Sequence, residues 1–433
     1  MAEFWSNNDR GYRIRLWIDQ ISQDIGGNSS QVRIRLALLN TSTTFTGYSC
    51  SAFVDFDGGR RINWSGSPSV LSYNQTMWLI DQTVTVQHNA DGTKIFGIMA
   101  QFNGGGGYSP GTLTVGGTSF RLTTIPRSSS VSAGSGIIGN NLQININRQS
   151  SSFKHDIRYS WFGKSGTIAS NVDTSASWSI PLDFANDIPS SNSGTGTIYV
   201  DTYSGGTKTG TQSTSFTVSV PDGIRPTLKD ISLSDTSGIV QNLLGENNFL
   251  QIISGVKVNF GNAIGAYGST ITGYYAEIVG KNQSTTTQGG SLGIMNYHGT
   301  ATIRATVTDS RGKTSLPIEK TINILEYFAP VISFDVNRTG ATSSTFTVNR
   351  NVKIAPLNIN GKQKNTMSLR FKVSQFGANH FSVDNGSASG TWTTISQLTN
   401  SQANLSGNYA ANHSWTVLGC LLYTSPSPRD STS

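Results

Sequence analysis

The sequence predicts an all-β protein built from tandem β-sandwich domains. Apolar and polar residues alternate with a period of two along most of the chain, which is the pattern of strands that bury one face. Clusters of Gly, Asn and Ser separate these runs. Proline recurs at Pro126, Pro226 and Pro330, at intervals of 100 and 104 residues. This spacing matches an immunoglobulin-like sandwich, which has about 100 residues.

Three segments show the alternation most clearly. In Thr300–Thr308 (TATIRATVT), Ala, Ile and Val share one face, whereas Thr and Arg share the other. Arg13–Asp19 (RIRLWID) and Gln31–Leu38 (QVRIRLAL) repeat the pattern with arginines outward. Strands with one apolar face predict antiparallel sheets packed in two layers. Helical patterns are almost absent; Gln241–Phe249 is the nearest candidate, and Gly245 weakens it.

Proline-containing junctions divide the chain into four units. Ile125–Arg127 closes the first, Val220–Pro226 the second and Ala329–Pro330 the third. Units two to four are predicted to be immunoglobulin-like sandwiches. The first unit contains four of the eight tryptophans and is predicted to be a separate sandwich or jelly roll. The predicted domains are 1–127, 128–221, 222–328 and 329–419.

The last strands of these units are also visible in the sequence. The second unit ends with the pattern GTIYVDTY, SGG, TSFTVSV, and the third with two strands around the turn signal at Asp309–Gly312. In the fourth unit the penultimate strand is predicted to begin within His413–Val417. We therefore expect the fourth sandwich to be truncated and to lack its closing hairpin.

The last residues of the chain differ in character from the rest. CLLYTSPSPRD (420–430) resembles the translation, in one reading frame, of a transposon-end adapter used in sequencing libraries. A Pro-rich extension is the alternative. We treat 420–433 as an adapter artefact and exclude it from fold reasoning. Cys50 is then the single native cysteine, and we expect it to be a small buried residue.

Composition excludes several classes of function. Charged residues make up 13% of the chain, against about 25% in an average soluble protein. The net charge of +7 comes from scattered residues, and no Lys/Arg run indicates a nucleic-acid partner. No apolar stretch reaches the ~18 residues of a membrane helix. The N-terminus does not resemble a secretory signal, so the chain is expected either to stay inside the cell or to leave it by assembly and lysis.

No motif predicts a catalytic or cofactor site. Gly134–Gly139 matches G-x-G-x-x-G, but the strand-like Asn141–Arg148 follows it, so we interpret it as a linker. Asp55–Gly59 resembles the start of a calcium loop but lacks its remaining ligands, and a hairpin turn is favoured. The segment His88–Lys94 (HNADGTK) is likewise interpreted as a turn rather than as a ligand-binding loop. The histidines lack metal-ligand spacing, and nothing pairs two carboxylates for glycoside hydrolysis. We predict a non-enzymatic protein without metal or cofactor.

Aromatic residues give the one indication of binding. Trp64 and Tyr108 lie in polar, Gly-rich surroundings and are predicted to contact a glycan. The alternative is that Trp64 belongs to the core, as expected for Trp161. Trp17 stays undecided, because alternation places it on the face of the outward Arg13 and Arg15.

Four segments resemble a known family. They are TVTVQHNADGTK (83–94), SFRLTTIPRSSSV (119–131), TDSRGKT (308–314) and VNRNVKIAPLNINGKQKNTMSLRFKV (348–373). Together they make residues 1–419 similar to minor structural proteins of long-tailed phages of Gram-positive bacteria, catalogued as a domain of unknown function. The family has no catalytic residues to carry over.

This resemblance implies a structural component of the virion tail, at the tail tip or fibre, assembled in the host cytoplasm. Its implied partners are other phage tail proteins and host cell-wall polysaccharide, and an oligomer is compatible with it. Two alternatives stay open. A bacterial surface adhesin with immunoglobulin-like repeats would need a secretion signal and an anchor. A polysaccharide-degrading tail enzyme would need a carboxylate pair.

Overall fold

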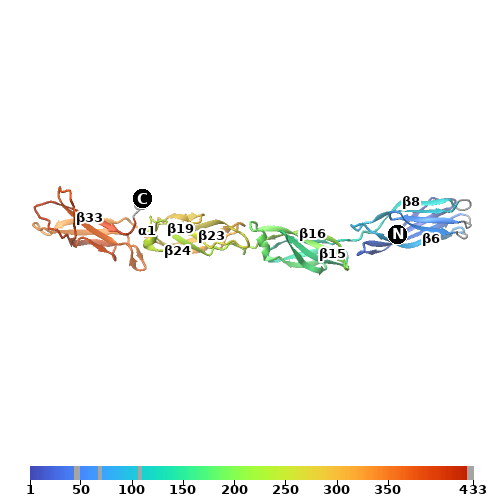
Figure 1. Ribbon diagram of the computed structural model, residues 1–433, viewed down its shortest axis with the longest axis horizontal. Coiled ribbons are helices and arrows are strands. Elements are labelled where there is room, and N and C mark those ends of the chain that lie inside the picture. Colours follow the sequence, from blue (N-terminus) through green and yellow to red (C-terminus); the bar gives the residue numbers. More distant parts are fainter. Residues whose placement is uncertain (43–48, 67–70, 106–109, 427–433) are drawn as a thin grey trace. The chain divides into compact units, whose positions relative to one another are not determined.

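A computed structural model describes residues 1–42, 49–66, 71–105 and 110–426 (Figure 1). Strands dominate these ranges, so the predicted all-β class is confirmed. The chain divides into two compact units, the first made of 1–184 with 193–221 and the second of 185–192 with 222–433. The predicted division into four domains, with its boundaries, remains a prediction.

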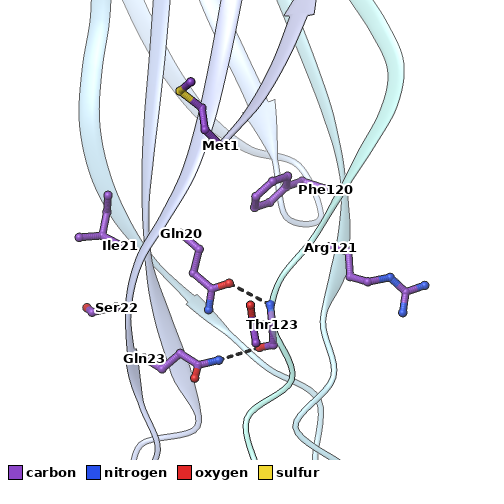
Figure 2. Close-up of a pocket in the computed structure, with 8 residues that line it drawn as sticks. All are labelled: Met1, Gln20, Ile21, Ser22, Gln23, Phe120, Arg121 and Thr123. Atoms are coloured by element: carbon purple, nitrogen blue, oxygen red, sulfur yellow. Dashed lines mark hydrogen bonds between the residues drawn. The ribbon is translucent and has the colours of Figure 1, made fainter.

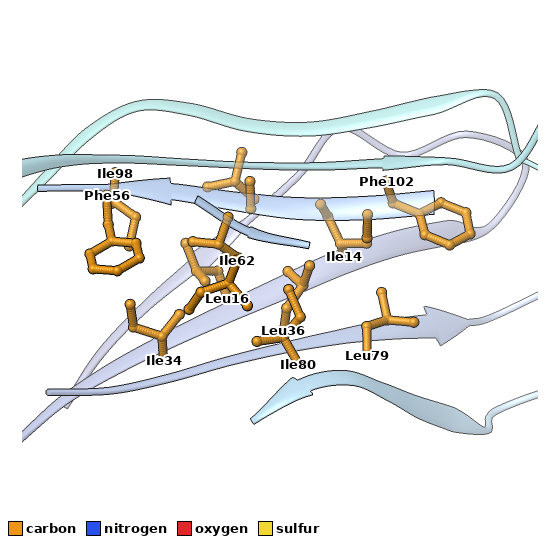
Figure 3. Packing of buried hydrophobic residues seen from close by; sticks show 14 of the residues in the cluster. Ile14, Leu16, Ile34, Leu36, Phe56, Ile62, Leu79, Ile80, Ile98 and Phe102 are labelled. Carbon is orange, nitrogen blue, oxygen red and sulfur yellow. The ribbon is translucent and has the colours of Figure 1, made fainter. Parts of the chain in front are cut away.

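The first unit begins with two four-stranded antiparallel sheets. One has the order β1-β2-β3-β6 and the other β5-β4-β7-β8. Apolar residues of both sheets form one core, part of which is shown in Figure 3. These sheets therefore form a sandwich, one of the two architectures predicted for this region. The strands are β1 (Ala2–Trp5), β2 (Tyr12–Asp24), β3 (Ser29–Asn40), β4 (Cys50–Phe56), β5 (Arg60–Gly66), β6 (Thr76–Gln87), β7 (Ile95–Asn103) and β8 (Thr112–Arg121).

Turn chemistry fixes the register of this sandwich. Asp57, Gly58 and Gly59 all have positive φ between β4 and β5, so the predicted hairpin at this point is confirmed. In the turn that contains Asp91, its carboxylate accepts from the backbone N–H of Thr93 at 2.9 Å, as expected of an Asp-Gly turn. Cys50 is 3% exposed, which confirms the prediction of a small buried residue.

A second sandwich completes the first unit. Its sheets have the orders β10-β16-β15-β12-β13 and β14-β11-β9. The Trp161 ring is fully buried and stacks on Phe184 at 4.9 Å, so its predicted core role is confirmed. The strands are β9 (Ser130–Ala133), β10 (Ser135–Ile137), β11 (Asn141–Asn147), β12 (Phe153–Trp161), β13 (Lys164–Val172), β14 (Ser175–Ser179), β15 (Ser193–Ser204) and β16 (Thr207–Ser219). The 3₁₀ helix η1 (Leu182–Asp187) spans the boundary between the two units after Phe184.

The G-x-G-x-x-G segment is not a linker, which corrects our interpretation. Ser135–Ile137 is strand β10, paired in parallel with β16. Gly136 points inward, and a Cβ there would come within 3.1 Å of Ile180. A strand that needs a small residue was thus mistaken for a flexible connection.

The carboxylate of Asp201 on β15, in the same sandwich, accepts hydrogen bonds from several side chains. It is 6% exposed and accepts from Arg158 Nε at 2.9 Å, Lys208 Nζ at 2.8 Å and Thr211 Oγ1 at 2.6 Å. Burial alone would raise the pKa of Asp201, but the hydrogen bonds from these donors outweigh it and hold the pKa well below its usual value.

The second unit contains a third sandwich, with sheets β17-β19-β22 and β18-β24-β23-β20-β21. On β23, Ile303 and Ala305 are fully buried and Val307 nearly so, which confirms the predicted inner face of Thr300–Thr308. The elements are β17 (Asp230–Asp235), α1 (Gly238–Leu244), β18 (Asn248–Leu250), β19 (Gly255–Gly261), β20 (Ile271–Ile278), β21 (Ser284–Thr285), β22 (Gly290–Ile294), β23 (Gly299–Asp309) and β24 (Ile318–Leu325).

The observed helix, α1 (Gly238–Leu244), begins and ends earlier in the chain than the candidate segment Gln241–Phe249. Helix α1 starts after Ser237, whose side chain accepts from the Val240 N–H, and ends at Gly245 with φ of 77°. Gly245 is thus the C-cap rather than a weak interior position. The last two residues of the predicted segment, Asn248 and Phe249, belong instead to strand β18 (Asn248–Leu250).

Arg311, in the loop after β23, has a fully buried side chain. Its guanidinium donates to four backbone carbonyls, those of Ala185 (2.7 Å), Ile188 (3.1 Å), Ala266 (2.6 Å) and Tyr267 (2.7 Å). Asp309 lies 3.9 Å away. Burial lowers the pKa of Arg311, and Asp309 partly opposes this shift.

A fourth sandwich ends the second unit. One sheet has the order β25-β26-β32; in the other, β29 pairs with β30, β31 and β33. Their apolar residues share one core. The strands are β25 (Val331–Arg338), β26 (Phe346–Lys353), β27 (Asn358–Ile359), β28 (Lys362–Gln363), β29 (Met367–Gln375), β30 (Ser382–Asp384), β31 (Gly390–Trp392), β32 (Gln397–Asn404) and β33 (Trp415–Tyr423), of which β27 and β28 form a separate hairpin.

The strand that the sequence predicted to begin within His413–Val417 begins at Trp415, as β33. The strand continues through Cys420 to Tyr423, and Leu421 and Tyr423 pack against the core. Part of the adapter-like segment therefore takes a place in the sheet. Its origin remains a prediction.

Candidate functional site

The outer face of the sheet β1-β2-β3-β6 carries a row of tryptophan and arginine side chains. Trp5 lies on β1, Arg15 and Trp17 on β2, Arg35 on β3 and Trp78 on β6. We call these five residues the Trp/Arg ladder. Trp5 and Trp78 are 43% and 53% exposed, respectively, whereas Trp17 is 8% exposed. Exposed tryptophans gathered on one face mark a binding surface more often than isolated ones do.

Strand alternation and register build this ladder. Ile14, Leu16 and Ile18 of β2 are fully buried in the core, so the residues between them point outward. Pairing then places Trp5 opposite Arg15, and Trp17 opposite Arg35. The neighbours across the strands are therefore alternately aromatic and cationic.

The contacts within the ladder are close. The Arg15 guanidinium carbon lies 4.3 Å from the Trp17 ring centroid and 4.8 Å from that of Trp5. The Arg35 carbon lies 5.8 Å from Trp17 and 5.9 Å from Trp78. The rings of Trp17 and Trp78 are 5.1 Å apart at 37°. Cation–π contacts of this kind hold the exposed rings in fixed orientations.

Carboxylates neutralise the arginines. Glu3 accepts from Arg15, and Asp19 accepts from Arg35 at 2.8 Å. The hydrogen bond from Arg15 is the main reason why the pKa of Glu3 lies below its ordinary value. Trp5 Nε1 also donates to Glu3 at 2.6 Å. An ionised, paired carboxylate of this kind accepts hydrogen bonds but does not act as a general acid.

A cleft of about 620 Å³ adjoins the ladder (Figure 2). Met1 joins the two features, because it lines the cleft while its amino group lies 3.6 Å from Asp19. Phe120 points into the space, and Arg121 points away from it (Figure 2). The cleft is lined by Met1, Gln20, Ile21, Ser22, Gln23, Phe120, Arg121 and Thr123.

Two amides of β2 bind the segment that follows β8 across this cleft. Gln20 Oε1 accepts from the Thr123 N–H at 2.8 Å, and Gln23 Nε2 donates to the Thr123 carbonyl at 2.7 Å (Figure 2). Strand β1 pairs with β2 only as far as Ile18, so these amides lie beyond the paired segment. The cleft presents amides and one aromatic ring, which suits a ligand rich in hydroxyl or amide groups.

The ladder and cleft contain no reactive constellation. Within residues 1–42, 49–66, 71–105 and 110–426, no three His, Cys, Asp or Glu side chains gather in a way that could hold a metal ion. The same ranges contain no helix of the length and apolarity that a membrane span requires. What the ladder offers chemically is flat rings with paired hydrogen-bonding groups between them.

Of the two residues predicted to contact a glycan, the structure describes only Trp64, and it lies away from the ladder. Trp64 lies on β5 of the opposite sheet and is half-buried against the core. Its ring lies so close to Gly66 that a side-chain Cβ at this position would be only 3.0 Å from the ring. Tyr108 lies outside the described residues. The structure does not bring Trp64 together with the ladder's tryptophans, and the role of both predicted residues remains a prediction.

Sequence reasoning did not single out Trp5 and Trp78 and left Trp17 undecided. The signal for Trp17 was available, because alternation already placed it beside outward arginines. Trp5 and Trp78 join it only through cross-strand pairing, as when Trp78 pairs with Ala37, and a single sequence does not specify that pairing.

Several solved structures resemble the chain in fold type. One is the tetra-tandem repeat in the extending region of a large adhesion protein, at 12% identity, covering 94% of this chain and 98% of that one, with a TM-score of 0.26. Another comprises the three N-terminal domains of the highly immunogenic outer capsid protein (Hoc) of bacteriophage RB49, at 12% identity, with 68% and 90% coverage and a TM-score of 0.27. The FN1–FN3 domains of chicken CNTN1 match at 10% identity, 71% and 97% coverage and a TM-score of 0.20.

At these identities and TM-scores, the similarities carry no argument about function. No curated protein matches the chain significantly. One family model, by contrast, matches residues 1–425, nearly the whole length. The chain therefore belongs to the family described as siphovirus protein of unknown function (DUF859).

Proposed function

We propose that this protein is a non-enzymatic structural component of a siphophage tail, at the tail tip or fibre, that contributes to attachment to a host surface glycan. Membership of a siphovirus family supports a role in the virion. The outward-facing Trp/Arg ladder is the observation that carries the attachment role. Its partners would be other tail proteins and a cell-wall polysaccharide.

The ladder suits a sugar better than a polyanion. Sugar rings present flat C–H faces that pack on indole rings, and hydroxyl groups that pair with charged side chains. Because Arg15 and Arg35 are already matched by Glu3 and Asp19, the two arginines of the ladder have little free charge to attract phosphate. The cleft beside it offers further amide groups from Gln20 and Gln23.

Sedimentation of the full chain with isolated Gram-positive cell walls would test glycan binding. The double change Trp5→Ala with Trp78→Ala should weaken binding at least about tenfold, which is roughly 1.4 kcal/mol. Phe162→Ala is the matched control, because Phe162 is an aromatic residue of the second sandwich with 59% exposure. It should leave binding unchanged.

Two further arms identify the ligand and the residues. Periodate treatment of the walls, which cleaves sugar diols, should abolish binding, whereas protease treatment should not. Trp64→Ala and Tyr108→Ala test the residues predicted from the sequence. If both of these weaken binding while the ladder double variant does not, the ladder is not the binding face.

The place in the virion is tested separately. Gold-labelled antibody against residues 1–127 should mark the end of the tail in electron micrographs of phage particles. Label on uninfected bacterial cells and none on virions would favour a bacterial surface adhesin and contradict the tail assignment.

A further inference from the structure

The two exposed rings of the Trp/Arg ladder lie at the ends of one row of residues that crosses the sheet. Trp5 of β1 pairs with Arg15 of β2, and Arg15 pairs with Ala37 of β3. Ala37 in turn pairs with Trp78 of β6. The row therefore runs perpendicular to the strands. Because neighbouring strands are about 4.8 Å apart, the backbone positions of Trp5 and Trp78 are separated by three spacings, or about 14 Å.

A β-bulge brings Trp78 into this row. The register of β3 with β6 shifts between Leu36 and Ala37, and Leu79 is the extra residue on β6. Leu79 and the following Ile80 are both buried, whereas Trp78 faces outward and is 53% exposed. Bulges commonly re-aim a side chain next to a functional site.

The surface between the two end rings is covered by the ladder itself. Trp17 is 8% exposed and Ala37 is fully buried, although both face outward on their strands. Trp5, at the other end of the row, is 43% exposed. A ligand that stacks on indole rings therefore meets two separate rings, Trp5 and Trp78, rather than one continuous aromatic patch.

The arginines near these rings keep hydrogen-bond donors for a ligand. Arg15 donates to Glu3 through Nη2. Arg35 uses the same atom toward Asp19. In the part of the chain that the structure describes, Nη1 of neither arginine donates to a protein acceptor. Since the charge of each guanidinium is already matched by a carboxylate, these remaining N–H groups suit neutral hydroxyl or carbonyl oxygens.

We propose, on the basis of the attachment function proposed above, that the ladder binds one linear, neutral glycan chain laid across the strands. Trp5 and Trp78 stack on sugar units at the two ends of the bound segment, and the arginines donate to the units between them. One sugar unit advances such a chain by about one strand spacing, so the shortest ligand that reaches both rings has about four units.

Stacking at both ends predicts that affinity depends on the length of the glycan. A disaccharide contacts one ring at a time. A chain of four or more units contacts both, because its second sugar contact forms within an already bound molecule, at a high effective concentration. Affinity should therefore rise in one step between these lengths and change little for longer chains.

A protein partner is the competing occupant, because Trp and Arg are also enriched at protein interfaces. The next row of the same face favours the glycan. It runs from Glu3 through Trp17 and Arg35 to Asp81. Asp81 also pairs with Arg33 at 2.6 Å. The centres of protein interfaces are depleted of such charged groups, whereas hydroxyl groups of a sugar can hydrogen-bond to them.

The probes are neutral oligosaccharides released by partial hydrolysis from the Gram-positive walls used for sedimentation and separated by length. They are titrated onto the full chain by calorimetry. We expect the dissociation constant to fall at least about tenfold from the disaccharide to the tetrasaccharide fraction. Trp5→Ala and Trp78→Ala should each reduce the affinity for the tetrasaccharide to about that for the disaccharide. Phe162→Ala, the control, should change neither affinity.

Unchanged urea unfolding midpoints establish that the variants fold, and Trp5→Ala on the edge strand β1 is a sufficient test if Trp78→Ala unfolds. Equal affinity for the disaccharide and the tetrasaccharide would overturn the proposed two-ring binding but leave glycan attachment intact. If no oligosaccharide binds and protease treatment of the walls abolishes sedimentation, the occupant is a protein, and both the two-ring binding and the proposed glycan attachment are wrong.

Discussion

Replacing Arg311 by Met should destabilise the second unit strongly. Met keeps most of the side-chain volume but removes the guanidinium, so the change deletes the hydrogen bonds without leaving a large cavity. Four backbone carbonyls, including those of Ala185 and Ala266, lose a charged donor in a place from which solvent is excluded. The carboxylate of Asp309 also loses its cationic neighbour.

The magnitude follows from two opposing contributions. Hydrogen bonds from a charged donor are worth about 1.5–3 kcal/mol each, so four of them set a generous upper limit. Against this, burial of the guanidinium is itself costly, as its lowered pKa indicates, and the variant avoids that cost. We expect a net loss of about 3–5 kcal/mol, the range seen when one partner of a buried network is removed.

Urea unfolding of the full chain measures this loss, with Arg304→Met as the control. Arg304 lies on β23, the strand that precedes the loop of Arg311, but it is 44% exposed and pairs with Glu319 at 2.8 Å. Its removal should cost at most about 1 kcal/mol. If the two variants unfold at the same urea concentration, the burial and bonding of Arg311 are not what stabilises this part of the unit.

Three other predictions concern single residues. Ile303→Asp would bury an unpaired carboxylate on the fully covered face of β23 and should cost several kcal/mol; unchanged thermal unfolding would mean that the register is wrong. The depressed pKa of Asp201 contributes about 2 kcal/mol to the free energy of unfolding at neutral pH, and this contribution is lost as the pH falls through and below 3.8. Asp201→Asn should therefore make the free energy of unfolding depend less on pH in this acidic range, which a pH series of unfolding measurements would show. Burial raises the pKa of the Cys50 thiol, so a thiol reagent should modify Cys420 quickly and Cys50 only after unfolding, and two fast thiols would contradict this.

Much of the fold was predictable, because side-chain alternation along a strand is a local property. Thr300–Thr308 shows its buried face in its own residues, and the hairpin at Asp57–Gly59 shows its turn in its glycines. Both features depend on neighbours in sequence. The all-β class and the immunoglobulin-like type of the tandem sandwiches followed from them.

Features that depend on cross-strand pairing were not predictable. The Trp/Arg ladder joins β1, β2, β3 and β6, and the register between them is set by the common core. Strand β10 was mistaken for a linker because its pairing partner β16 lies about 80 residues later, at Thr217–Ser219. Trp64 shares one face of β5 with the buried Ile62, and its predicted contact with a glycan remains a prediction.

The parallel pairing of β10 with β16 has a mechanical consequence. The chain enters the second sandwich at β9, continues directly into β10 and leaves at the end of β16, and Ser135, Gly136 and Ile137 pair with Thr217, Val218 and Ser219. When the two ends of this segment are pulled apart, parallel strands slide along each other, so the force loads the hydrogen bonds together in shear. An antiparallel hairpin pulled at its open end would lose them one at a time. A force that pulls β10 and β16 apart along the chain would therefore meet hydrogen bonds loaded in shear, and β18 with β24 repeats the parallel pairing in the third sandwich.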